Sequence, residues 1–222
     1  MSRRYGQHCA LAKSLDLVGD RWTLLIVREL LDGPKRYVDL LGGLAPIATD
    51  MLASRLRDLE ANGLVVRRET PPPTVARLYE LTPRGASLDG VIDAFARWGF
   101  TLVEQREPGD VVVPRWIARA VSAIVRPDRA PVDLVVRLCL PEGASTLRIT
   151  DTSVEAIGDH VPVDVTLTGD AELLAQAIEP RRAAELIAAG DITVVGTQHC
   201  VRELAEVFDI AALAAAHGSS SS

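Results

Sequence analysis

Apolar positions in the first part of the chain recur with the spacing of amphipathic helices. After a candidate N-cap at Asp20, Trp22, Leu25, Ile26 and Leu30 share one helical face. Glycine 33 follows this run, and glycines at 42–43 and 63 follow two further runs of helical spacing. The pattern predicts helices from Asp20 to before residue 33, over 36–41 and over about 48–62.

The third of these helices has two different faces. Leu52, Leu56 and Leu59 form a stripe that is expected to be buried. At about 100° per residue, the residues on the opposite side are Asp50, Ala53, Ser54 and Arg57. This side is predicted to face solvent or a partner.

Two short alternating runs, 64–69 and 76–81, flank a proline turn at 71–73 and predict a β-hairpin. Thr82 and Pro83 then form a helix start, and a last helix is predicted over 83–105. Its wide apolar face carries Leu88, Val91, Ile92, Phe95, Trp98 and Leu102. Such a face must be buried, either within its own chain or against a second copy.

Helices followed by an arginine-bearing hairpin are the order of a winged helix-turn-helix, which places one helix in the DNA major groove. Ser54 and Arg57, with Thr49 near the helix start, are candidates for base contacts. Basic residues before the second helix and on the hairpin are candidates for phosphate contacts. The full candidate set is Lys35, Arg36, Thr49, Asp50, Ala53, Ser54, Arg57, Arg67, Arg68 and Arg77. The alternative is a set of ordinary solvated charges, among which Asp50 is a first-turn acid favoured by the helix dipole.

The second half has the alternation of strands. Apolar residues alternate over 132–140, at 147–149 and over 161–168, and 192–195 is a further short run. Helical patterns lie at 116–125, after Asp170, over 183–189 and over 201–208. Antiparallel strands with helices on one face are predicted, which is an α+β layer.

A turn-like break at 107–110 separates the halves. We predict a winged helix-turn-helix domain at 5–106, a small α/β sandwich at 111–214 and a flexible tail at 215–222, an α+β chain overall. Charge also differs between the halves of this 222-residue chain, whose net charge is −6. Residues 1–106 carry 15 Lys/Arg and 13 Asp/Glu, whereas 107–222 carry 9 and 17.

Composition and motifs narrow the function classes. The longest uninterrupted apolar run is seven residues, at 210–216, whereas a membrane span needs ~20. No signal-peptide core is visible. Cys9, Cys139 and Cys200 lack the spacing of a disulfide framework or a zinc site. The sequence has no hydrolase, metalloprotease, phosphate-loop or dinucleotide motif. We therefore expect a cytoplasmic protein that is not an enzyme and holds no cofactor or metal.

The first half resembles the HxlR family of bacterial winged-helix regulators. The resemblance is carried by Tyr5–Cys9, Leu17–Ile26, Arg28–Leu30, Asp39–Leu40, Met51–Glu60, Gly63–Val65 and Tyr79–Gly85. It implies a homodimeric transcription factor that binds double-stranded DNA at a pseudo-palindromic operator, with the first and last helices of the domain at the dimer interface. Ala48 stands where the family often has a hydroxyl residue, and Thr49 is the candidate replacement cap.

The second half is similar to the sterol-carrier-protein-like fold, through Val163–Asp170 and Ala189–Gly196. The resemblance implies an apolar cavity between sheet and helices that binds a lipid-like or polycyclic ligand. Its candidate lining residues are Trp116, Val136, Leu138, Val165 and His199. The alternatives are a filled core or a domain that only dimerises.

These features together predict a DNA-binding regulator whose affinity is set by a small apolar effector in the second domain. One alternative places the switch at Cys9, because in some members of the HxlR family a cysteine at this position senses oxidants. Another is a lipid-binding carrier whose winged helix contacts proteins.

Overall fold

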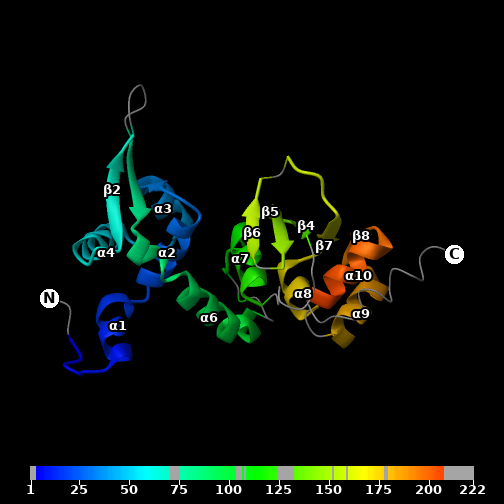
Figure 1. Cartoon of the computed structure of the whole chain (residues 1–222), viewed down its shortest axis with the longest axis horizontal. Coiled ribbons are helices and arrows are strands. Elements are labelled where there is room, and N and C mark those ends of the chain that lie inside the picture. Colours follow the sequence, from blue (N-terminus) through cyan, green and yellow to red (C-terminus); the bar gives the residue numbers. More distant parts are fainter. Residues whose placement is uncertain are drawn as a thin grey trace. The chain divides into compact units, whose positions relative to one another are not determined.

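The computed structural model describes residues 4–70, 76–103, 107, 109–124, 133–151, 153–158, 160–177 and 180–207. Two compact units make up the chain, residues 1–92 and 93–222, coloured from blue to red in Figure 1. The predicted proline turn at 71–73 and the predicted tail at 215–222 lie outside the described residues.

The first unit begins with helices that are joined by short turns. They are α1 (Ala10–Val18), α2 (Thr23–Leu31), α3 (Tyr37–Gly43) and α4 (Thr49–Ala61). The last three confirm the predicted helices. α2 and α4 are each followed by a glycine in the left-handed region, with φ of 115° at Gly33 and 69° at Gly63.

The hairpin is also confirmed, as β2 (Val65–Glu69) paired with β3 (Arg77–Leu81). The short strand β1 (Lys35–Arg36) pairs with the other edge of β3, so the described strands of this sheet have the order β1-β3-β2. All these pairings are antiparallel. The sheet thereby ties the start of α3 to the hairpin that follows α4.

The single helix predicted over 83–105 is wrong. The chain instead forms α5 (Pro83–Ala86), α6 (Asp89–Gly99) and the 3₁₀ turn η1 (Phe100–Val103). The Thr82 hydroxyl caps α5 by accepting from the Gly85 amide at 3.1 Å. The Ser87 hydroxyl donates to the Arg84 carbonyl oxygen at 2.8 Å. Such a local side-chain bond competes with the helical pattern, and the helix starts again at Asp89.

The core of the first unit lies between α2, α3 and α4. Its largest fully buried side chains include Ile26, Leu40, Leu52, Leu56 and Leu59. The predicted apolar stripe of α4 is therefore buried, which leaves the opposite side of this helix at the surface.

The second unit is a mixed sheet with helices. Its elements are α7 (Pro114–Ile124), β4 (Asp133–Leu140), β5 (Gly143–Thr150), β6 (Val154–Ile157), β7 (Val165–Thr168), α8 (Ala171–Gln176), α9 (Pro180–Ala189), β8 (Thr193–Gly196) and α10 (Gln198–Val207). The strand order among the described residues is β6-β5-β4-β7-β8.

The prediction of purely antiparallel strands is wrong, because β4 and β7 are parallel neighbours with Val136 opposite Val165. β6, a strand that the alternation did not reveal, pairs with the far edge of β5. From β6 the chain must cross β5 and β4 to enter β7, which lies on the other side of β4 and runs parallel to it. β7 begins at Val165, later than predicted. The residue before it, Asp164, uses its carboxylate to accept a hydrogen bond from the Val135 amide at 2.8 Å.

Apolar side chains fill the space between this sheet and the helices on one of its faces. Buried residues from β4, β5 and β7 contact Ile117 and Val121 of α7, Leu174 of α8 and Val201 and Leu204 of α10. At the end of the β4–β5 ladder, Arg148 Nε donates to Asp133 Oδ1 at 2.7 Å. This bond lowers the pKa of the Asp133 carboxyl and raises that of Arg148.

The predicted turn after the first half is present, because the Asp110 amide donates to the Glu107 carbonyl oxygen at 3.0 Å. It lies within the second compact unit, which begins at residue 93. Gly109 takes a φ of 96° in this turn. Within the described ranges, no helix combines the length and the apolar character needed to cross a membrane.

Gly85 lies directly against the backbone at Leu64. A Cβ added there would lie 2.0 Å from the Leu64 carbonyl oxygen. We expect Gly85→Ala to lower the free energy of unfolding by about 1–3 kcal/mol, because backbone must shift. Gly90 of α6 has open space around it, so the control Gly90→Ala should raise this energy by up to about 1 kcal/mol. Equal effects in urea denaturation would contradict this account.

Candidate nucleic-acid interface

The exposed side of α4 is a strip of polar residues. Because Leu52, Leu56 and Leu59 are buried, the helical period places Asp50, Ser54 and Arg57 on the opposite side. Asp50 and Arg57 are exposed, and Ser54 is half-buried. Arg57 forms no ion pair with any residue that the structure describes. A strip of this kind matches the donor and acceptor groups that base edges present in a major groove.

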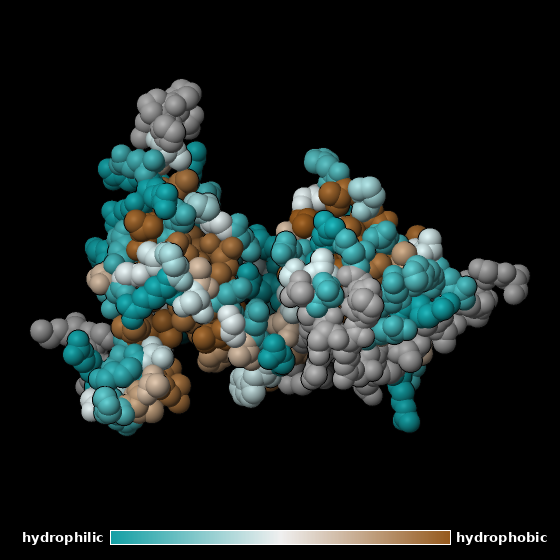
Figure 2. Space-filling model, in the orientation of Figure 1, coloured by the Kyte–Doolittle hydropathy of each residue, from teal (hydrophilic) through white to brown (hydrophobic). Residues whose placement is uncertain are grey.

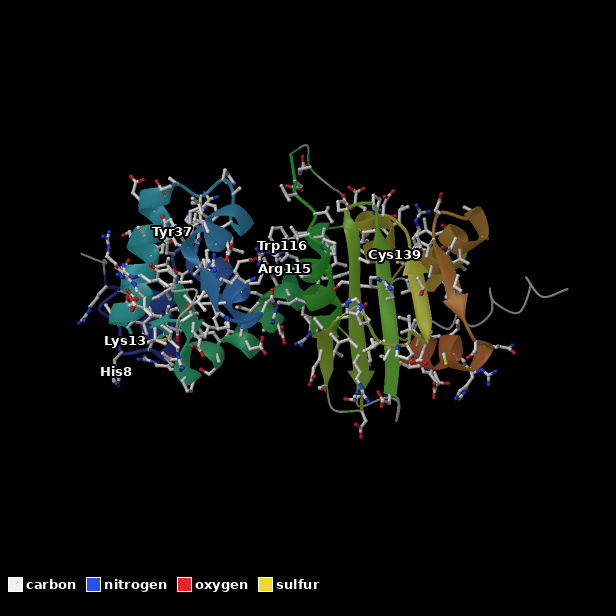
Figure 3. All side chains as sticks on the ribbon, turned by 90° about the horizontal axis from the view of Figure 1, so that it is seen from above. His8, Lys13, Tyr37, Arg115, Trp116 and Cys139 are labelled. Atoms are coloured by element: carbon white, nitrogen blue, oxygen red, sulfur yellow. The ribbon has the colours of Figure 1, made fainter. Side chains whose placement is uncertain are left out.

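The start of α4 is held by α3. The Tyr37 hydroxyl (labelled in Figure 3) donates to the Thr49 carbonyl oxygen at 2.6 Å. Ala48 is the N-cap and offers no side-chain bond. Thr49 does not replace it as a cap, because its hydroxyl donates to Asp50 Oδ1 at 3.2 Å. Tyr37 was not found by sequence reasoning, because its periodic position gives no sign of a partner twelve residues away.

The middle of α4 is held by the turn before α2. Arg55 Nη1 lies 3.6 Å from Asp20 Oδ2 and 3.2 Å from Asp58 Oδ2. The other carboxylate oxygen of Asp20 accepts from the Trp22 amide at 3.0 Å. The predicted N-cap at Asp20 is wrong, because Trp22 occupies the N-cap position of α2 and no side chain caps this helix. The Asp20 carboxylate instead positions α4 through Arg55, a second positioning residue that sequence reasoning missed.

The hairpin arginines are all engaged by glutamates. Arg67 Nε lies 2.8 Å from Glu60 Oε1, and its guanidinium lies over the Tyr79 ring at 5.4 Å from the centroid. A second bond joins Arg67 Nη2 to Glu60 Oε2 at 3.0 Å. This two-bond contact ties the hairpin to the end of α4. Arg68 pairs with Glu80 and Arg77 pairs with Glu69.

Lys35 and Arg36 are adjacent but differ in their surroundings. Lys35 Nζ lies 3.6 Å from Glu29 Oε2 and 3.7 Å from Asp32 Oδ2. The Glu29 side chain is only 1% exposed, and it also accepts from Arg28 at 3.0 Å. Arg36 is exposed at the start of α3. The structure therefore places Lys35 in a partly buried ion-pair network and Arg36 at the surface.

The candidate ligand residues of the second unit do not all lie together. Val136, Leu138 and Val165 are buried in one core cluster. Trp116 is half-buried on α7, beneath the Arg115 guanidinium at 5.8 Å. His199 is exposed on α10, with Nε2 3.5 Å from Glu203 Oε1. The strand residues thus form an apolar layer, and His199 lies at the surface.

Cys9 is an exposed free thiol at the N-cap position of α1. Cys139 is half-buried in β4 (Figure 3), and Cys200 is half-buried near the start of α10. Among the described residues, no cluster of three His, Cys, Asp or Glu side chains is arranged to hold a metal ion.

Comparison with known proteins bears on the part of the chain that carries this surface. Residues 17–107 match the HxlR-like helix-turn-helix family. The HTH-type transcriptional regulator YodB of Bacillus subtilis is 36% identical over 102 residues, 46% of this chain and 88% of that protein. The solved reduced form of YodB matches with 36% identity and a TM-score of 0.39, covering 47% of this chain and 100% of that one. The redox regulator HypR in its reduced form matches with 28% identity and a TM-score of 0.39, covering 42% and 92%.

The ion pairs of Lys35 predict that its removal affects folding. Lys35→Ala leaves the buried Glu29 carboxylate with one partner fewer, so the free energy of unfolding should fall by about 1–3 kcal/mol. Arg36→Ala removes the same charge from an exposed position and should change it by at most about 0.5 kcal/mol. Urea denaturation of both variants measures the difference. A neutral effect of Lys35→Ala would show that this network contributes nothing to stability.

Proposed function

Because the chain belongs to the HxlR-like helix-turn-helix family of transcriptional regulators, we propose that it acts as a cytoplasmic homodimer on a pseudo-palindromic DNA operator. Residues 5–106 bind DNA and dimerise, and residues 111–214 bind a small apolar effector. The observation that carries the DNA-binding part is the polar strip of α4, which lies opposite a fully buried stripe.

In this proposal α4 of each protomer enters the major groove. The Arg57 guanidinium can donate two hydrogen bonds to the O6 and N7 atoms of a guanine. The Ser54 hydroxyl can donate to an acceptor or accept from a donor on a base edge. Arg36 contacts a DNA phosphate. The hairpin arginines do so as well when they leave their glutamate partners and bind a phosphate instead. Successive half-sites are about one helical turn apart, as the two-fold symmetry of such a dimer requires.

The dimer is supported by apolar side chains that the chain leaves at its surface. On α6 and η1, Phe95, Trp98 and Leu102 follow helical spacing, and Trp98 and Leu102 are 75% and 70% exposed. On α1, Leu11 is 68% exposed. Figure 2 shows hydrophobic surface in the region of α1. Apolar area of this kind is typical of an interface, here with a second copy.

The effector is proposed to enter the apolar layer between the sheet and the helices of the second unit. Val136, Leu138 and Val165 of this layer are covered by α7 and α10. A ligand there displaces helix contacts and therefore binds one arrangement of the helices better than another. It changes DNA affinity only to the extent of that difference.

Two alternatives remain distinct from this proposal. Cys9 is exposed, as a thiol that senses oxidants must be. An oxidant response of DNA binding that survives Cys9→Ser would exclude this switch. The other alternative is a lipid carrier, which gains support if the protein binds every duplex with the same weak affinity.

Fluorescence anisotropy on a duplex from upstream of the protein's own gene, against a scrambled duplex, tests DNA recognition. Specific binding is expected to be ~1,000-fold tighter or more. Arg57→Ala should weaken specific binding about 5- to 150-fold, the effect of losing one good base contact. Arg202→Ala removes an exposed arginine of α10 and should leave binding unchanged. If both variants weaken binding equally, Arg57 has no special role.

The dimer is tested with Trp98→Glu, which places a charge in the proposed interface. Sedimentation velocity should show a dimer for the wild type and a monomer for the variant, because an unpaired charge is costly to bury. Val195→Glu changes another exposed apolar residue, in β8, and should remain dimeric. A wild-type protein that is monomeric at every concentration would refute the proposed dimer.

A further inference from the structure

We propose that Glu69 and Glu80 of the hairpin compete with DNA phosphates for Arg77 and Arg68, and so keep the affinity of the protein for non-specific DNA low. This inference rests on the proposed DNA-binding function and adds a control on it. Its basis is the pairing of hairpin cations with acids on both faces of β2 and β3.

The first pair lies directly across the hairpin. Glu69 is opposite Arg77 in the antiparallel register, and Arg77 Nε donates to Glu69 Oε1 at 3.2 Å. The side chains are 73% and 64% exposed. Arg77 is therefore at the surface, where a phosphate can reach it, but its charge is already compensated.

The second pair lies diagonally on the other face. Arg68 is opposite Leu78, and Glu80 is opposite Val66, yet Arg68 Nε lies 2.5 Å from Glu80 Oε2. Successive residues of a strand point to opposite faces, so Arg68 and Glu69 lie on different faces of the hairpin. Whichever face approaches DNA, it presents an arginine that is held by a carboxylate.

These two pairs differ from the contact between Arg67 and Glu60. Arg67 makes two bonds to Glu60, a residue of α4, and lies over Tyr79. That contact joins two elements of the fold. The pairs of Glu69 and Glu80 stay within the hairpin, and their hydrogen bonds connect one strand only to its neighbour.

A carboxylate makes the same charge-assisted hydrogen bonds to arginine as a phosphate oxygen does. Each arginine must leave its glutamate to bind DNA, and the released glutamate then repels the same phosphates. Non-specific affinity comes mainly from the counterions that DNA releases when cations neutralise its phosphates. An arginine that is already paired with a glutamate neutralises little phosphate charge and therefore releases few counterions. Exposed ion pairs are weak, so the exchange can still occur at an operator, where base contacts hold the DNA in place.

The test is the binding of a random-sequence duplex to full-length Glu69→Gln/Glu80→Gln protein over a range of KCl concentrations. We expect the double variant to bind this duplex about 3- to 30-fold more tightly at low salt than the wild type does, because each freed arginine gains a phosphate contact. The slope of log affinity against log salt should steepen by about 0.9 for each new contact. Each single variant should give part of this gain.

The matched control is Glu185→Gln/Glu206→Gln. It changes net charge equally and removes the carboxylate that pairs with Arg182 of α9 at 3.0 Å, outside the hairpin. Adding Arg68→Gln and Arg77→Gln to the hairpin double variant should abolish the gain. A gain no larger than that of the control, or one that survives loss of both arginines, would overturn the proposal. Thermal unfolding verifies that each variant is folded.

The outcome is separable from that of the proposed function. If the wild type does not prefer the upstream duplex, operator recognition fails, whereas the glutamate effect is measured on the random duplex alone. If recognition succeeds and the hairpin variants behave like the control, only the competition is wrong.

Discussion

Burial of one face of α4 determines what the first unit presents to a partner. Leu52, Leu56 and Leu59 are at most 2% exposed, and burying each leucine contributes about 1.5–3 kcal/mol. A rotation of α4 by one residue would move a polar side chain into this core. The orientation of Asp50, Ser54 and Arg57 is thus set by packing on the other side of the helix. Tyr37 then holds the start of α4 against α3, and Arg55 holds the middle of α4 against the turn before α2.

The sequence was most informative where a structural period repeats. The stripe of α4, the hairpin and the central strands could be predicted, because burial imposes periods of 3.6 and 2 on nearby residues. The HxlR-like resemblance is confirmed for the N-terminal part. The sterol-carrier resemblance, the domain limits and the site residues stay predictions. The break at Ser87 and the parallel pairing of β4 with β7 were missed, because they depend on one local bond and on contacts distant in sequence.

Ion-pair partners were also beyond sequence reasoning. Lys35 and Arg36 are adjacent basic residues, yet only Lys35 lies against the buried Glu29. The hairpin shows the same effect, since a count of arginines overstates its positive charge. Whether a cation is available to a ligand depends on which acids the fold brings to it, and the bare composition does not contain that information.

The parallel pairing of β4 with β7 also bears on the order of folding. The centre of the second sheet cannot close until residue 168 has left the ribosome, because β7 supplies one of its inner strands. The contacts of the first unit join residues that are all synthesised earlier. Since domains generally fold as units with the N-terminal one first, nascent chains acquire the exposed strip of α4 before they acquire the unit proposed to regulate it.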